Sequence, residues 1–86
     1  MRKAQFIKDL SGFTGTAKLW RIFDDGDKVH YIISSATKVW FEDSRPETYL
    51  FPSDASGNVT DWLELPGSEK DTLDHAAAVR RYCGGK

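Results

Sequence analysis

The sequence predicts a small α+β fold: an antiparallel sheet of four to five strands with one C-terminal helix packed on one face. Three observations lead to this prediction. Two apolar segments flank Asp25 and Gly26, a pair that favours a hairpin turn because both turn positions need positive φ. β-branched and aromatic segments recur over residues 37–65. Residues 69–83 alone combine a capping motif with helical spacing, and strands followed by a helix indicate an α+β domain.

Size and composition indicate that residues 1–86 form a single small domain. A content of 40% hydrophobic and 13% aromatic residues exceeds that of a disordered chain. No apolar run reaches the ~18 residues of a membrane span, and the basic start is not followed by a signal-peptide core. Because Cys83 is the only cysteine and can form no internal disulfide, we expect a protein of the cytoplasm.

Charge is unevenly distributed along the chain. Residues 1–41 carry seven basic and four acidic side chains, a net +3, whereas residues 42–78 carry two and nine, a net −7. Two interpretations remain open: an ordinary mixed surface, which is favoured, or a polarised molecule whose acidic face could attract a basic protein.

The N-terminal segment, residues 1–15, is predicted to lie at the edge of the sheet. Phe6 and Ile7 fit the end of a strand, although with Leu10 they also fit a short helical turn. Gly12 and Gly15 break either pattern, so a loop is expected before the next strand.

The central hairpin is predicted to span residues 16–34. A loop of two or four residues at its tip places Phe23 opposite Lys28. One side of the ribbon is then nearly apolar and is expected to face the core and the helix: Trp20, Ile22, Val29, Tyr31 and Ile33. The other side mixes apolar and basic residues: Leu19, Arg21, Phe23, His30 and Ile32.

Three further strands are predicted within residues 37–65, after a polar break at residues 34–36. They cover residues 37–42, 47–51 and 59–65, and Pro52 is expected to end the second or confine it to an edge. A turn rich in Ser, Asp, Gly and Asn separates the last two.

The C-terminal helix is predicted over residues 69–83. Ser68 and Asp71 have the spacing of a capping box, and Gly84 with Gly85 is expected to end the helix. A thin apolar stripe would face the sheet: Leu73, Ala76, Val79 and Cys83. Ala78 lies on the opposite side of this helix.

Four strings in the second half carry a resemblance: PETYLFP at residues 46–52, GNVTDW at 57–62, ELPGS at 64–68 and LDH at 73–75. In these the chain resembles short uncharacterised proteins encoded by actinobacterial phages and, in some cases, by their hosts. The resemblance implies a context, a small accessory protein made inside an infected bacterium, and no activity.

Catalysis is the least favoured class of function. Eight residues separate His75 from Cys83, about 12 Å along a helix, too far for a nucleophile and its base. His75 is therefore interpreted as a capping or surface residue. The histidines and Cys83 lack the spacing of a zinc site, so no metal and no cofactor are expected.

The mixed side of the hairpin is the predicted partner-binding surface: Leu19, Arg21, Phe23, His30 and Ile32. Arginine beside aromatic residues is typical of an interface centre. A non-enzymatic protein that seizes a host protein is therefore the main hypothesis, with no role for a membrane. A single-strand nucleic-acid module is the first alternative, although its basic groove would be short. A homodimer formed through the same surface is the second.

Overall fold

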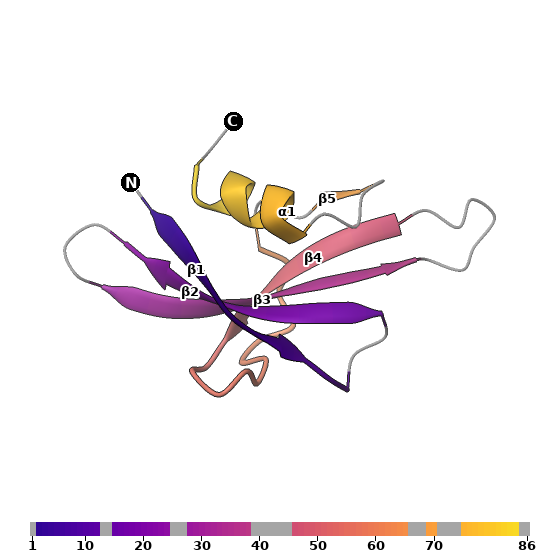
Figure 1. The fold of residues 1–86 in the computed structure, drawn as a ribbon, viewed down its shortest axis with the longest axis horizontal. Coiled ribbons are helices and arrows are strands. Elements are labelled where there is room, and N and C mark those ends of the chain that lie inside the picture. The colour runs from indigo at the N-terminus through magenta and orange to yellow at the C-terminus, as the bar shows by residue number, and fades with distance from the viewer. Residues whose placement is uncertain are drawn as a thin grey trace.

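One helix packs on a five-stranded antiparallel sheet, whose fifth strand has only two residues, in the computed structural model (Figure 1). This confirms the predicted α+β fold. The structure describes residues 2–12, 15–24, 28–38, 46–65, 69–70 and 75–84. The elements are β1 (Lys3–Leu10), β2 (Thr16–Phe23), β3 (Val29–Lys38), β4 (Pro46–Ser53), β5 (Glu69–Lys70) and α1 (His75–Tyr82).

The sheet is a meander, in which each strand pairs with its neighbours in the sequence, in the order β1-β2-β3-β4-β5. β1 therefore lies at an edge, as predicted for the N-terminal segment. Phe6 pairs with Trp20 and Lys8 pairs with Leu19, so Ile7 is an extra residue in a β-bulge. Regular pairing in the first half of β1 thus ends at Phe6.

The hairpin of β2 and β3 forms as predicted, but its predicted register is wrong by one residue. Phe23 pairs with Val29 and not with Lys28. At the tip, the Asp24 amide donates to the Lys28 carbonyl over 2.8 Å. Because side chains alternate between faces, this shift changes which residues of β3 share a face with each residue of β2.

β3 runs without interruption from Val29 to Lys38, so the predicted break at residues 34–36 is wrong. Ser34 is fully buried there, and its hydroxyl group is hydrogen-bonded to two other side chains. A buried polar group with its hydrogen bonds made is compatible with the middle of a strand. Of the predicted strand 37–42, only the first two residues are described, as the end of β3.

β4 confirms the predicted strand at residues 47–51 and continues through Pro52. Proline lacks an amide donor, which limits it to places where one edge of a strand is free. β5 pairs only with Glu47 and Thr48, so no strand of the described sheet pairs with that side of β4 at Pro52, where the Thr60 amide donates to the Pro52 carbonyl over 3.0 Å.

The predicted strand at residues 59–65 is wrong. A single bridge joins Val59 to Ser53, and no regular element follows up to Leu65. The turn before it folds tightly, because the Asp54 carboxylate accepts the amides of Ser56 and Asn58 at 2.9 Å. The segment then passes the free edge of β4, where the Leu65 amide donates to the Leu50 carbonyl over 2.7 Å.

The helix is shorter than the predicted range of 69–83. It covers His75–Tyr82, and Glu69–Lys70 forms β5 where the first helical turn was expected. The predicted capping residues Ser68 and Asp71, and Leu73 of the predicted stripe, lie outside the described residues. The predicted end is confirmed, because Gly84 has φ of 90° and its amide donates to the Arg81 carbonyl.

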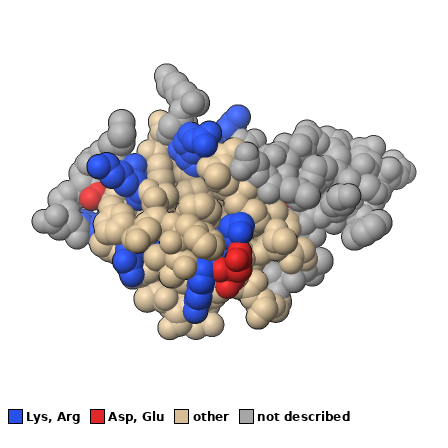
Figure 2. Space-filling view, in the orientation of Figure 1, with Lys and Arg blue, Asp and Glu red and all other residues tan. Residues whose placement is uncertain are grey.

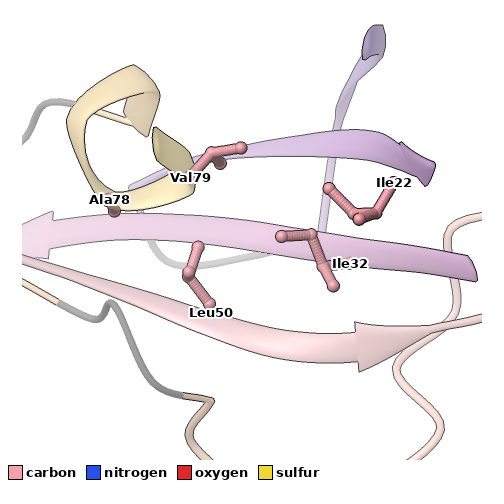
Figure 3. Close-up of a cluster of buried hydrophobic side chains, with 5 residues drawn as sticks. All are labelled: Ile22, Ile32, Leu50, Ala78 and Val79. Carbon is pink, nitrogen blue, oxygen red and sulfur yellow. The ribbon is translucent and has the colours of Figure 1, made fainter. Parts of the chain in front are cut away.

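The main core lies between α1 and the sheet (Figure 3). We call this side of the sheet the helix face and the other side the outer face. Five side chains are buried together on the helix face: Ile22, Ile32, Leu50, Ala78 and Val79. Val79 of the predicted stripe is buried as expected, whereas Ala78 is in the core and Ala76 is exposed, the reverse of what was predicted for these two residues.

A second core lies on the outer face. Ala17, Leu19 and Ile33 are buried there, with Ile7, Leu10, Tyr31 and Val59 packed against them. The turn at residues 54–58 lies on this side, opposite the helix (Figure 1). Gly57 has φ of 92° and comes so close that a Cβ atom on it would lie 2.8 Å from Leu10. The residues expected to pack together under the helix are therefore divided between two faces.

Replacing Ile22 with Ala should lower the free energy of unfolding by about 2–5 kcal/mol, because it leaves a cavity in the main core. Val29→Ala is the matched control, since this β-branched side chain of the paired strand is 46% exposed. The control should change stability by no more than ~0.5 kcal/mol. Urea unfolding followed by tryptophan fluorescence measures both, and equal losses would contradict the assignment of the faces.

The Asp54 turn should make stability depend on pH. The amide and side chain of Asn58, with the other amides of the turn, hold the pKa of the Asp54 carboxyl below its ordinary value. The stabilisation of the fold by the ionised Asp54 carboxylate should therefore be complete above the unfolded-state pKa of ~3.9. It should be lost as the pH falls through the folded-state pKa. Urea unfolding of the wild type and Asp54→Asn should show a difference at neutral pH that shrinks in acid. A difference independent of pH would contradict this assignment.

Candidate functional site

The five residues predicted to bind a partner do not form one surface. Arg21, Phe23 and Leu19 lie on the outer face, whereas His30 and Ile32 lie on the helix face, because of the one-residue change of register. Leu19 and Ile32 are fully buried in the two cores and can contact no partner. Of the predicted surface, only Arg21 and Phe23 remain at least partly exposed together on the outer face.

The outer face of the hairpin carries a surface that we call the hairpin patch: Arg21, Phe23, Val29 and Tyr31. Phe23 and Val29 are a cross-strand pair and are 38% and 46% exposed. Beside them, the Arg21 Nε donates to the Tyr31 hydroxyl over 3.3 Å, and the guanidinium carbon lies 5.7 Å from the centre of the Tyr31 ring. Sequence reasoning missed Val29 and Tyr31, because the predicted register turned them towards the helix.

Three aromatic rings follow one another along β4 and the segment after it. Tyr49 stacks on Phe51 with ring centres 6.2 Å apart, and Phe51 contacts Trp62 edge-on at 5.3 Å. Trp62 is 71% exposed, the largest value among the exposed hydrophobic side chains described. A hydrogen bond from the Tyr49 hydroxyl to the Glu47 carboxylate raises the pKa of Tyr49 to about 12. Carboxylates therefore border this row.

A groove of about 440 Å³ lies between β1 and α1. Its apolar lining comes from β1, β2, α1 and the residue that follows α1: Ala4, Trp20, Ala76, Val79 and Cys83. Three basic residues line it as well: Arg2, Lys3 and Arg80. On this side of the molecule Lys and Arg side chains are prominent and Asp and Glu are sparse (Figure 2).

Phe6 extends the apolar surface of the groove along β1. It is 46% exposed, and its ring contacts Trp20 edge-on with centres 5.6 Å apart. Lys18 places its ammonium group 5.1 Å from the centre of the Phe6 ring and is held by Asp9 at 2.6 Å. Sequence reasoning used Phe6 only to place a strand. The signal that could have indicated an exposed surface was an aromatic residue between lysines in an edge strand.

His30 belongs to a polar cluster that joins the N-terminus, the hairpin tip and the helix. Asp24 accepts from Arg2 Nε at 2.7 Å and from His30 Nδ1 at 3.0 Å. Since the carboxylate can only accept, Nε2 of a neutral His30 is left to accept from the Tyr82 hydroxyl at 2.8 Å. Arg2 also lies over the Tyr82 ring, 4.7 Å from its centre.

The order carboxylate, imidazole, hydroxyl is that of a nucleophile relay. Burial raises the pKa of the Tyr82 hydroxyl, which disfavours its ionisation. Burial likewise raises the pKa of the Cys83 thiol, which is thereby less reactive. The contacts of Tyr82 with His30 and Arg2 connect residues near the two ends of the chain.

His75 is buried, so its interpretation as a capping or surface residue is wrong. Its Nδ1 lies 2.6 Å from the Ser34 hydroxyl and its Nε2 lies 2.8 Å from the Thr16 hydroxyl. Ser34 also accepts from the indole N–H of Trp20 at 2.8 Å. With Nε2 protonated, each of these three hydrogen bonds runs from a donor to an acceptor: Trp20 to Ser34, Ser34 to His75, and His75 to Thr16. Ser34 has no access to solvent, so this serine–histidine pair connects the helix to the sheet.

Two features are absent from the described part of the chain. No group of three or more His, Cys, Asp or Glu side chains there could hold a metal ion. No helix there is both long and apolar enough to cross a membrane.

No protein-family model matches the chain, and no curated protein or solved structure is recognisably similar to it.

Replacing Ser34 with Ala should lower the free energy of unfolding by about 1–3 kcal/mol, because the Trp20 indole and the His75 imidazole each lose a buried partner. Ser35→Ala is the matched control, since this half-buried neighbour lies on the other face of β3. It should change stability by at most ~0.5 kcal/mol. Thermal and urea unfolding measure the difference; equal effects would show that the buried chain of hydrogen bonds contributes nothing net.

Proposed function

We propose that this chain is a small non-enzymatic interaction module that binds a partner protein through the hairpin patch. The observation that carries the proposal is the exposed Phe23–Val29 pair beside the Arg21–Tyr31 pair, on a face of the sheet that α1 does not cover. The resemblance to phage-encoded proteins suggests the cytoplasm of a bacterial host as the setting and a host protein as the partner.

The composition of the patch favours protein binding. Tyrosine and arginine are enriched among the residues that dominate binding energy, and the apolar pair beside them would exclude water. Arg21 is also held in place, by Tyr31 and by Gln5, whose side-chain oxygen lies 3.4 Å from its guanidinium group. A side chain that is already ordered loses less conformational entropy when a partner binds.

Nucleic-acid binding is less well supported. A single strand would stack its bases on exposed aromatic rings and place its phosphates near basic side chains. The most exposed aromatic row is bordered by carboxylates instead, since both Glu47 and Glu64 act on Tyr49. Phosphates at this row would therefore be repelled.

The test is a double substitution, Arg21→Ala with Phe23→Ala. Affinity capture from an actinobacterial lysate with mass spectrometry first identifies a partner, which is then purified. We expect the double variant to bind it at least ~100-fold more weakly, the effect of losing about 2.7 kcal/mol at an interface centre. Phe6→Ala is the control, because Phe6 is similarly exposed but lies on the helix face, where it contacts Trp20. It should leave the affinity unchanged.

Two other outcomes would overturn the proposal. Tight binding of labelled single-stranded DNA or RNA that falls steeply with added salt would favour the nucleic-acid alternative. A dimer in sedimentation that the double variant dissociates would show that the patch serves self-association. Circular dichroism of each variant confirms that the fold is retained.

A further inference from the structure

β1 offers an unpaired strand edge beside the groove. In the described sheet it has a strand neighbour on one side only, β2. Its first four residues, Lys3 to Phe6, are exposed and pair regularly with β2. The free edge therefore presents backbone N–H and C=O groups in a row, which another strand can pair with.

We propose that this edge binds an extended peptide segment in which apolar and acidic residues alternate, as an added strand. The site lies at the groove between β1 and α1 on the helix face, whereas the hairpin patch lies on the outer face, where Phe23 and Arg21 pair with Lys3 and Gln5 of β1. The proposal does not depend on the proposed function. Main-chain hydrogen bonds to the edge would supply part of the affinity, and alternate side chains would supply specificity.

The helix face of β1 would contact the apolar residues of the bound peptide. Ala4 and Phe6 lie there, beside Trp20 at the base of the groove. A side chain directly opposite Ala4 on an added strand would have its Cβ about 4.5–5.5 Å away. Ala4 has only a methyl group as its side chain, so a Leu- or Phe-sized side chain opposite it can lie over Ala4 and enter the groove.

Trp20 lines the groove, and its ring is held in one orientation by neighbouring residues. Its indole N–H donates to the buried Ser34 hydroxyl, which sets the orientation of the ring. Phe6 packs edge-on against the same ring. A pocket wall that is already ordered needs no rearrangement when the peptide binds, which favours affinity.

The remaining side chains select the acidic residues. Although Lys3 is one of the residues at the groove, its side chain alternates with that of Ala4 and so points to the outer face, where it would lie next to the intervening residues of the added strand. Arg80 lines the groove from α1, and Arg2 lies at its N-terminal end. Among the described residues, the carboxylate of Asp9 is bonded to Lys18, and that of Asp24 is bonded to Arg2 and His30. The site therefore has net positive charge towards a ligand, and opposite charges across strands are favourable.

The same charges disfavour a second copy of this chain. A β1 strand brought to the edge would carry its own lysines into the basic site, and like charges across strands are destabilising. The bulge at Ile7 further limits regular pairing to the first half of the strand. A short acidic segment of another protein fits both limits.

The probe is a short fluorescein-labelled synthetic peptide in which Leu and Glu alternate. Fluorescence anisotropy should show saturable binding, and amide shifts in NMR spectra should move at residues 3–6 together with the Trp20 indole signal. Lys3→Glu should weaken binding about tenfold, because Lys3 lies beside the acidic residues of the peptide. Lys8→Glu is the matched control, because this exposed lysine of the same strand lies beyond the bulge at Ile7, and it should have little effect.

Two altered peptides test the mode of binding. Replacing Glu with Lys should abolish binding, and N-methylating alternate amides on the edge-facing side should do the same, because the added strand loses its donors. Equal binding of either altered peptide, no binding of the Leu–Glu peptide, or a dimer in sedimentation that Lys3→Glu alters would overturn the proposal. Val29→Ala should leave peptide binding unchanged, because Val29 belongs to the hairpin patch but lies on β3, which does not pair with β1. Failure here can therefore be told apart from failure of the hairpin patch.

Discussion

The pairing of Phe23 with Val29 is the constraint on which the rest of this fold depends. It places Ile22 and Ile32 together on the helix face, where α1 covers them, and Leu19 with Ile33 on the outer face. In a two-faced sheet a slip of one residue would exchange these sets on one strand and expose buried aliphatic groups. The register therefore determines both cores and, through them, which side chains remain for binding.

The helix depends on the sheet for its place and for its stability. A helix of eight residues is too short to be stable alone in water. Apolar contact through Ala78 and Val79 is supplemented by polar contacts near both of its ends. His75 at the start is bonded to Thr16 and Ser34, and Tyr82 at the end is bonded to His30. Such directional contacts fix the position of the helix more narrowly than apolar packing does alone.

The short helix also explains why the molecule has two candidate surfaces. α1 contacts β3 and β4, so the helix face of β1 and β2 remains partly open and forms the groove. On the outer face the turn at Gly57 approaches Leu10 and Leu19, whereas Phe23 and Val29 at the hairpin tip stay exposed. Neither surface can be predicted from one strand alone, because each depends on which part of the sheet α1 and the turn at Gly57 leave exposed.

Local signals in the sequence were sufficient for the fold class, the hairpin, the edge position of β1 and the C-terminal end of the helix. They failed where distant contacts decide. The five residues from Asp24 to Lys28 separate the paired residues Phe23 and Val29, whereas the prediction assumed a loop of two or four residues. Ser34 looked like a break because its partners, Trp20 and His75, are 14 and 41 residues away. With the register misplaced, Ile32 was assigned to a binding surface although it lies in the core.

The lysines of β1 can both repel a basic strand and attract an acidic one. Lysine and a bulge on an edge strand are common means of preventing sheets from joining edge to edge. Lys3 and the bulge at Ile7 have this effect towards copies of the same chain, whose β1 is itself basic. Charge repulsion is selective, however: it acts against a basic strand and becomes attraction for an acidic one. An edge that is closed to self-association by charge is thereby left open to a partner of opposite charge, and the apolar groove beside it limits that partner to strands with a large side chain opposite Ala4.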